Sequence, residues 1–210
     1  LASITTVLLL LIGIPLSALI AFKQFKLKSV LETIISMPLV LPPSVIGFYL
    51  LLTFSPVTAI GQFLVDHGIR LAFSFEGLVI SSVLFSLPFM IHPIQAALSQ
   101  VPKSIIEASY TLGKSKFETL IKVIIPYIRH GIISGMVLSF AHTIGEFGVI
   151  LMIGGNIPGE TRVASIAIYD EVESLNYAMA HQYALTLFVI TFTILLLVYI
   201  INKKSIGGRL

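Results

Sequence analysis

The sequence predicts an all-α protein whose helices cross a membrane several times. Hydrophobic residues make up 56% of the 210 residues and charged residues only 11%, and the mean hydropathy is +1.01. These values lie outside the range of soluble globular domains. The sequence has no alternating ten-residue strands of the barrel type, and lipid otherwise admits only helices. A polytopic membrane helix bundle with five or six transmembrane helices is therefore the predicted fold class.

Five spans are expected from the long uncharged runs, because about 20 apolar residues cross the hydrocarbon core. The run from 33 to 65 is too long for one crossing, and Ser55 followed by Pro56 predicts where its helix stops. The chain begins with leucine rather than methionine, so an earlier, sixth span stays open. The predicted spans are about 2–22, 33–54, 78–100, 131–153 and 182–201.

The positive charges predict the orientation of the spans. Eleven of the 13 Lys and Arg residues fall in residues 23–28, residues 103–129 and the C-terminal tail, and only Arg70 and Arg162 fall on the other side. Cytoplasmic loops carry the excess of Lys and Arg, so the loop and the tail are expected in the cytoplasm. The net charge of +3 is then a topology signal, and no nucleic-acid partner is expected. With no cysteine, a thiolate metal site is excluded.

Residues 105–126 are the most soluble-looking stretch between two spans. Residues 113–115, Gly-Lys-Ser, resemble the end of the phosphate-binding pattern G-x-x-x-x-G-K-[ST]. The first glycine of that pattern is Ala108 here. A phosphate loop also needs a parallel sheet, for which the roughly 30 residues between two membrane helices leave no room. A nucleotide site is therefore the weaker interpretation.

Helix signals describe this stretch better. Pro102 suits a first helical position, and Ser104 and Glu107 have the spacing of a capping box. Gly113 is suited to the left-handed conformation that closes a helix. A second capping box starts another helix over residues 115–126. The sequence thus predicts a short helix, a glycine turn and a second helix that leads back into the membrane.

The same stretch resembles the EAA loop of permease subunits of binding-protein-dependent ABC importers. The pattern E-A-A-x3-G-x9-I-x-L-P is matched by Glu107-Ala108-Ser109, Gly113 and Ile125-Pro126, with Ser109, Val123 and Ile125 as conservative departures. In that family the short helix docks on the ATP-hydrolysing subunit, and the resemblance implies this role for residues 103–120. A plain amphipathic loop on the bilayer surface is the alternative. The implied contact residues are Ser104, Glu107, Ala108, Ser109, Leu112, Gly113 and Lys114.

Prolines inside the second span predict a kinked or broken helix. Pro38, Pro42 and Pro43 remove three donors near mid-membrane. Broken helices at that depth commonly line the pathway of a transporter, whereas a packing kink without solute contact is the alternative. We therefore assign Pro42, Pro43 and Ser44 to a candidate pathway or gate.

The fourth span carries an acidic residue, Glu146, which is costly in a membrane unless it faces protein or water. His142 lies four residues earlier and is expected on the same helical face. A proton relay, a gate latch and a satisfied hydrogen bond all fit this pair, whereas two groups make at most half a metal site. His142, Glu146 and Phe147 complete the candidate pathway. Small residues at 131, 134, 135 and 139, and later at 145 and 148, predict close helix contacts and suggest a dimer face. They are Gly131, Ser134, Gly135, Ser139, Gly145 and Gly148.

Three further segments resemble the permease subunit of molybdate and tungstate importers and, more distantly, sulfate permeases. They are PLVLPPSVIGFYLL (38–51), GEFG (145–148) and GNIPGET (155–161), within a similarity that extends over about 30–180. The family implies one permease domain over 1–210, a second permease copy, ABC ATPase subunits, an external oxyanion-binding protein and an inner-membrane location. The chain itself then needs no cofactor and is no enzyme. The loop residues Gly155, Asn156, Ile157, Pro158 and Gly159 are the candidate contact with the binding protein.

Residues 162–181 predict an amphipathic helix at the outer surface, with a platform for the binding protein as the alternative. Three rivals to the importer are considered. They are a proton-coupled secondary transporter that uses Glu146 and His142, a structural anchor and an intramembrane enzyme, for which no catalytic constellation is present. Lys and Arg are absent from 33–69, 71–102 and 130–161. A dianion would therefore meet hydroxyls, helix N-termini and water in these spans.

Overall fold

The computed structural model describes residues 1–207, with side chains described through residue 200, and this part of the chain is helical without strands. Of the tail cations expected in the cytoplasm, Arg209 lies outside the described residues, and Lys203 and Lys204 lie outside the described side chains. The helices are α1 (Ala2–Phe22), α2 (Lys28–Ser36), the 3-10 turn η1 (Met37–Leu39), α3 (Pro43–Phe54), α4 (Ala59–Asp66), α5 (Phe75–Ser99), α6 (Lys103–Thr111), α7 (Lys116–Thr119), the π-helical turn η2 (Leu120–Ile124), α8 (Ile125–Tyr127), α9 (Arg129–Gly145), α10 (Gly148–Gly154), α11 (Ala164–Glu173) and α12 (Tyr177–Gly207).

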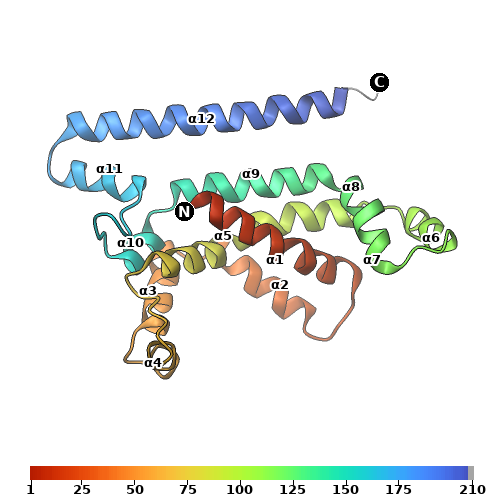
Figure 1. Ribbon diagram of the computed structural model, residues 1–210, viewed down its shortest axis with the longest axis horizontal. Coiled ribbons are helices and arrows are strands. Elements are labelled where there is room, and N and C mark those ends of the chain that lie inside the picture. The colour runs from red at the N-terminus through yellow and green to blue at the C-terminus, as the bar shows by residue number, and fades with distance from the viewer. Residues whose placement is uncertain (208–210) are drawn as a thin grey trace.

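The core of the molecule is α5, which lies between α1 and α9 (Figure 1). Gly13 of α1 lies so close to Met90 that an added Cβ would be 2.7 Å from its Cγ. On α9, a Cβ at Gly131 would be 2.9 Å from the Pro93 carbonyl oxygen, and one at Gly135 would be 2.9 Å from the Met90 carbonyl oxygen. Close helix contacts are therefore confirmed at Gly131 and Gly135, and both glycines of α9 pack against α5 of the same chain.

Three helices are each long and apolar enough to cross a membrane: α1, α5 and residues 177–200 of α12. Two bent helix pairs raise the number to five when each pair counts as one span. The predicted span 2–22 coincides with α1, whereas α5 begins three residues before its predicted start and α12 begins five residues before. The multi-span helical fold is thus confirmed.

The second predicted span is broken, as its prolines indicate. The axes of Lys28–Leu39 and Pro43–Phe54 differ by 113°, and Pro42 stands at the break in an extended conformation, with ψ 139°. Figure 1 shows α3 turning away from the central bundle. The helix ends at Phe54, before Ser55 and Pro56, as predicted. Helix α4, which follows, was not anticipated from the sequence.

The fourth predicted span is also interrupted, and here a continuous helix over 131–153 was wrong. Helix α9 ends at Gly145, and Glu146 is extended with ψ 128°. Two causes are visible: the break lies between glycines 145 and 148, which hold a helix weakly, and Gly148 approaches α3 closely. A Cβ at Gly148 would be 2.9 Å from the Pro43 Cβ, so the two breaks pack against each other.

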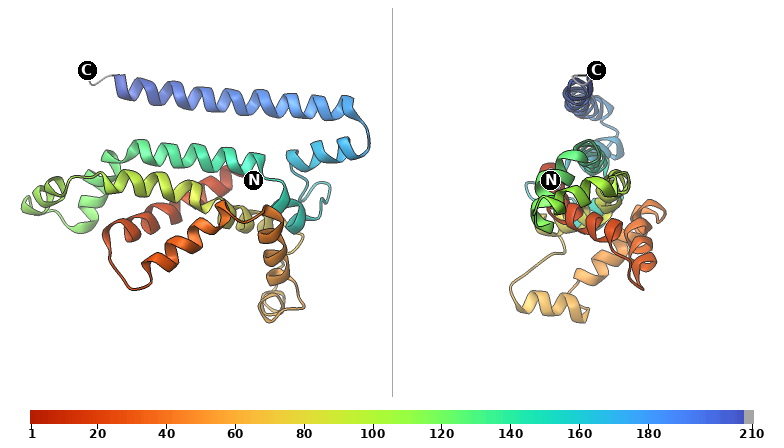
Figure 2. Two further views of the ribbon diagram at one scale, coloured as in Figure 1. Left: turned by 180° about the vertical axis from the view of Figure 1, so that it is seen from behind. Right: turned by 90° about the vertical axis from the view of Figure 1, so that its right-hand side faces the viewer.

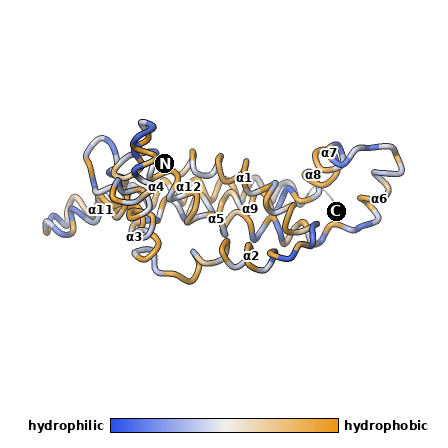
Figure 3. The backbone as a smooth tube through the Cα atoms, turned by 90° about the horizontal axis from the view of Figure 1, so that it is seen from below, coloured by the Kyte–Doolittle hydropathy of each residue, from blue (hydrophilic) through white to orange (hydrophobic). Residues whose placement is uncertain are grey.

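The distribution of hydropathy along the backbone fits a membrane protein. The hydrophobic colour dominates the middle of the molecule, and hydrophilic stretches gather near α6 and α7 at one end and near α4 and α11 at the other (Figure 3). Helix α12 runs beside the bundle rather than inside it (Figure 2). None of the residues in its most apolar 18-residue window is buried.

Candidate functional site

The first candidate site is the elbow formed by α6, the glycine turn and α7. Gly113 has a φ of +76°, the left-handed conformation predicted for it. The Lys114 amide donates to the Ser109 carbonyl at 3.2 Å, and the Gly113 amide donates to the Tyr110 carbonyl at 2.9 Å. These two bonds are the pattern of a Schellman motif, which satisfies the last carbonyls of α6.

The two predicted capping boxes differ in outcome. The second is confirmed: the Ser115 Oγ accepts from the Glu118 amide at 3.2 Å, and the Glu118 carboxylate accepts from the Ser115 amide at 3.3 Å. The first was wrong. Pro102, predicted at the first helical position, is instead the N-cap residue of α6, which has no side-chain cap bond. The helix begins at Lys103, so Ser104 is already inside it, past the position from which a side chain caps.

A buried hydroxyl pair joins the two arms of the elbow. The Ser109 Oγ lies 2.9 Å from the Thr119 Oγ1, and the two residues are 4% and 0% exposed. Ser109 therefore faces inward, although it was assigned to the ATPase interface together with its neighbours. The other predicted contact residues are at the surface or half-buried, and Leu112 is 79% exposed. Phe117, 72% exposed, adds a large apolar residue that the prediction missed.

The elbow is fastened to the membrane bundle by packing. Ile106 of α6 and Leu120 of η2 contact a core cluster that includes Leu98 of α5, Ile124 and Ile128. The segment that leads from α7 toward α9 passes through the π-helical turn just before Pro126. The short helix α6 is thus a rigid extension of α5 and α9 rather than a loose loop.

The second candidate site lies where the two helix breaks meet. A cavity of about 590 Å³ is lined by five of the six residues predicted for the pathway, and Pro42 is the exception. Phe85 of α5 adds an aromatic wall. Residues from α3, α5, α9 and α10 therefore converge on one opening, although they lie far apart in the sequence. The five predicted residues are Pro43, Ser44, His142, Glu146 and Phe147.

His142 is held by α5. Its Nδ1 lies 2.9 Å from the Ser86 Oγ, and that hydroxyl also lies 3.1 Å from the Thr143 Oγ1. The imidazole stacks on Phe89 with ring centroids 4.0 Å apart. Sequence reasoning missed Ser86, which polar residues recurring inside an apolar span could have indicated.

Glu146 is buried, with 4% of its surface exposed. Neither carboxyl oxygen makes a well-formed hydrogen bond in the described part of the chain, and the neighbouring polar group is the buried Ser82 hydroxyl of α5, which also lacks a partner. Its backbone carbonyl accepts a 2.8 Å bond from the Ser165 hydroxyl of α11. Because Glu146 is extended rather than helical, the premise that it shares a helical face with His142 was wrong. The two residues line one cavity, but their side chains are not hydrogen-bonded to each other.

The third candidate site is the loop at residues 155–159, which is folded by its neighbours. The Thr161 hydroxyl donates to the Gly154 carbonyl and accepts from the Ile157 amide at 2.9 Å. The Asn156 amide nitrogen donates to both carboxylate oxygens of Asp170 at 2.9 and 2.8 Å. Arg162 forms an ion pair with Asp170 at 3.1 Å. Asn156 is thus engaged in a network, whereas Gly155, Pro158 and Gly159 are exposed.

Comparisons with known proteins agree on one family. Residues 13–206 match the family described as "Binding-protein-dependent transport system inner membrane component". The chain is 44% identical over 208 residues to the molybdenum transport system permease protein ModB of Azotobacter vinelandii, covering 99% of this chain and 92% of that protein. It is 37% identical over 163 residues to ModB of Escherichia coli (strain K12), covering 77% and 71%. It is 31% identical over 186 residues to the sulfate transport system permease protein CysT of Synechocystis, covering 89% and 64%.

The matched residues include the core helix α5, the elbow and both helix breaks. The resemblance deduced from the EAA-like pattern is therefore confirmed at the level of the family. The similar proteins are named as permeases of transport systems, so the chain acts in transport and is no enzyme. It belongs to the family of inner membrane components of binding-protein-dependent transport systems.

Proposed function

We propose that the chain is the pore-forming permease subunit of an ABC importer for molybdate. The observation that carries the substrate is the 44% identity to a molybdenum permease over 92% of that protein, against 31% to a sulfate permease. Tungstate belongs to the same proposal because the family that the sequence resembles imports both molybdate and tungstate. Sulfate is the runner-up.

The elbow is the proposed docking site for a separate ATPase subunit. Two of its large residues, Leu112 and Phe117, are apolar and 79% and 72% exposed, and the elbow lies at a hydrophilic end of the molecule (Figure 3). Exposed apolar residues in a polar setting are typical of a protein interface. Glu107, also exposed, adds a charge to this surface. Ser109 supports the site from within, by its bond to Thr119, and makes no direct contact.

The meeting point of the two breaks is the proposed gate. The broken segments of α3 and α10 contact each other through small residues, and a cavity opens beside them. ATP binding elsewhere can shift the two conformations of such a gate only through different docking of the elbow in each. The orientation follows from charge: the elbow and the turn before α2, which hold most of the cations, lie at the same end of the molecule (Figure 1). We place that end in the cytoplasm.

The remaining partners follow from the same proposal. Two copies of this single-domain permease form the pore, and an external oxyanion-binding protein contacts the loop at residues 155–159. Pro158 and Gly159 are exposed at the end of the molecule opposite the elbow, as contact with an external protein requires. The lipid bilayer surrounds the assembly.

Uptake of radiolabelled molybdate into proteoliposomes tests the function. Vesicles that hold the permease, its ATPase and the binding protein are expected to accumulate molybdate only with ATP, and excess tungstate should compete better than sulfate. Uptake by the permease alone under a proton gradient would instead establish a secondary transporter. Preferential competition by sulfate would reassign the substrate.

A pair of elbow variants tests the docking site. Leu112→Asp places a charge in the proposed interface and is expected to lower ATPase co-purification by about tenfold, because an unpaired buried charge costs more than 1 kcal/mol. Val57→Asp, which places the same charge on an 83% exposed apolar residue between α3 and α4, serves as the control. Co-purification that is equal for the two variants would refute docking at this surface.

A further inference from the structure

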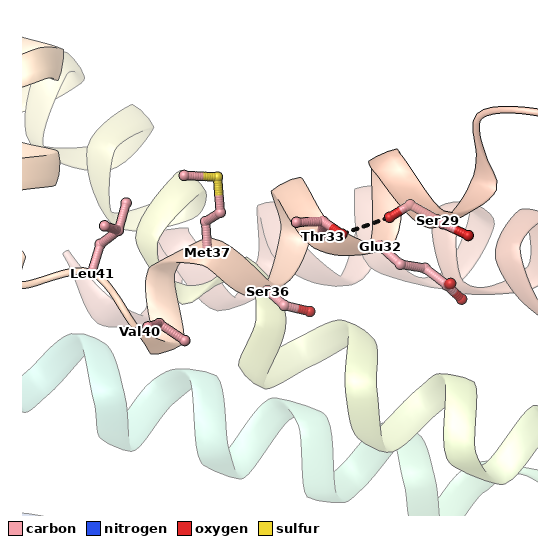
Figure 4. A pocket seen from close by; sticks show the side chains of 7 residues that line it. All are labelled: Ser29, Glu32, Thr33, Ser36, Met37, Val40 and Leu41. Atoms are coloured by element: carbon pink, nitrogen blue, oxygen red, sulfur yellow. Dashed lines mark hydrogen bonds between the residues drawn. The ribbon is translucent and has the colours of Figure 1, made fainter.

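Helix α2 carries a polar stripe that lies apart from the gate. Ser29, Glu32, Thr33 and Ser36 are spaced three or four residues apart and share one helical face. They line a groove of about 590 Å³ that continues to Met37, Val40 and Leu41 at the break (Figure 4). The groove thus leads along α2 from the lysine-rich turn toward the helix break.

The chain itself covers the other side of α2. Leu31 and Ile35 pack into a cluster with Ile20 of α1 and Ile91 of α5, and Ile35 is 3% exposed. The polar stripe is left open. Because α2 is the first half of a bent span, a polar face at this position must lie against water or protein rather than lipid.

Two bonds from α5 fix how the stripe is presented. The Gln95 Nε2 donates to the Glu32 Oε1 at 3.0 Å, and the Ser36 Oγ lies 3.2 Å from the His92 Nε2. These bonds lie one helical turn apart on both helices and prevent α2 from rotating about its axis. The Gln95 bond also engages the one carboxylate of the stripe.

The charges around the groove favour an anion. Lys23, Lys26 and Lys28 belong to the turn at its open end, where a cluster of like charges raises the local concentration of counter-ions. Inside the groove the polar side chains are three hydroxyls and the bonded Glu32 carboxylate. The Thr33 hydroxyl donates to the Ser29 carbonyl at 2.7 Å and the Ser36 hydroxyl contacts His92. Their oxygens can still accept hydrogen bonds from water, so the groove can hold a hydrated oxyanion without binding it tightly.

We propose that the polar stripe of α2 lines a water-filled vestibule through which a tetrahedral oxyanion passes between the gate and the lysine-rich mouth. The inference rests on the proposed import function and adds residues that it does not assign. Ser29 and Thr33 face the water of the vestibule, Ser36 and Glu32 are held by α5, and Gln95 is a positioning residue that fixes the Glu32 carboxylate.

The absence of cysteine from the sequence permits a direct test with single-cysteine variants. Thr33→Cys lies on the stripe, and Ile34→Cys, adjacent and 57% exposed, lies on the apolar side. The assembled importer in proteoliposomes is treated with a membrane-impermeant anionic methanethiosulfonate reagent from the face of the elbow. Thr33→Cys is expected to react about tenfold faster than Ile34→Cys, because lipid excludes the charged reagent. The reaction should also abolish ATP-driven molybdate uptake.

Equal or slower reaction at Thr33→Cys would overturn the vestibule, as would full uptake after its modification. The proposed function fails separately, if the unmodified importer shows no ATP-driven uptake. The labelling contrast is read without transport, so the two failures can be told apart.

A second pair of variants tests the role of charge. Gln95→Leu removes the bond to Glu32, whereas Gln95→Glu removes it and places a second carboxylate beside the first. If an anion passes Glu32, the Gln95→Glu importer is expected to transport about tenfold more slowly than the Gln95→Leu importer, because the added like charge repels it. Equal rates would show that no anion passes this position.

Discussion

The elbow and the meeting point of the helix breaks differ in how well their polar groups are hydrogen-bonded. Both are places where a helix stops and leaves backbone and polar groups without helical partners. In the elbow the Schellman bonds, the capping box at Ser115 and the Ser109–Thr119 pair satisfy these groups locally. At the break, Glu146 is buried with a carboxyl group that makes no well-formed hydrogen bond in the described part of the chain.

The difference indicates which region is built to stay fixed. The paired polar groups of the glycine turn and of α7 favour one conformation of the elbow, as a part that transmits force requires. An unpaired buried carboxyl group destabilises the conformation in which it is found. A second conformation that pairs or hydrates Glu146 would relieve this cost, as the proposed gate requires.

The largest expected effect is steric and falls on the break. Gly148→Leu would drive a side chain into Pro43, since even a Cβ would be 2.9 Å from the Pro43 Cβ. Overpacking of this kind costs about 3 kcal/mol, and we expect loss of uptake with a lower Tm of the detergent-purified protein. Gly145→Ala is the matched control, because a Cβ there has no atom within 4 Å. Equal Tm values for the two variants would contradict the close contact between α3 and α10.

The next largest expected effect is a gain in stability rather than a loss. Glu146→Gln replaces the buried carboxyl group by a neutral amide of the same shape and is expected to stabilise the protein by about 2 kcal/mol, because burying a carboxylate without a partner is costly. Uptake should fall, since stabilising this one conformation slows its exchange with the other conformation of the proposed gate. Thermal unfolding of the purified permease measures the first quantity and vesicle uptake the second. A lower Tm would show that Glu146 stabilises this conformation.

A smaller effect is expected inside the elbow. Ser109→Ala leaves the Thr119 hydroxyl buried without its partner, which costs about 1.5 kcal/mol. The double variant with Thr119→Val removes both polar groups and should recover most of that loss, since apolar groups of similar shape then face each other. Unfolding of all three variants completes a double-mutant cycle. Additive losses would mean that the two hydroxyls do not interact.

The smallest effect distinguishes the two caps of the elbow. Ser115→Ala removes a side-chain cap and is expected to cost about 1 kcal/mol. Ser104→Ala should change stability by less than about 0.5 kcal/mol, because its side chain makes no cap bond. Differential scanning of both purified variants compares them directly. A larger loss of stability for Ser104→Ala than for Ser115→Ala would show that the capping box predicted at Ser104 and Glu107 does form.

Much of the fold was predictable, because the signals are local or compositional. Uncharged length gave α1 and α5, the prolines gave the first break, and the spacing of Ser115 and Glu118 gave a capping box that is present. The left-handed Gly113 also follows from chemistry within a single turn. Each of these features depends on residues close in sequence, which explains the agreement.

The failures have a common cause in tertiary contact. The break at Glu146 has a local cause in glycines 145 and 148, but the contact of Gly148 with Pro43, more than a hundred residues away, is visible only in the fold. His142 is engaged by Ser86 of another helix, so its spacing from Glu146 gave the wrong partner. Ser109 was assigned to the interface from a family pattern, and only the fold shows that Thr119 holds it inside. The convergence of the predicted pathway residues on one cavity likewise required the fold.

The π-helical turn at Leu120–Ile124 connects the elbow to α9 through a segment whose hydrogen-bond register can change. A π turn holds one more residue than an α turn. Returning this segment to α-helical bonding would rotate everything on its far side by about 100° and advance it by about 1.5 Å. A local exchange of hydrogen bonds beside Pro126 can therefore turn a short pull on α6 into a twist of α9.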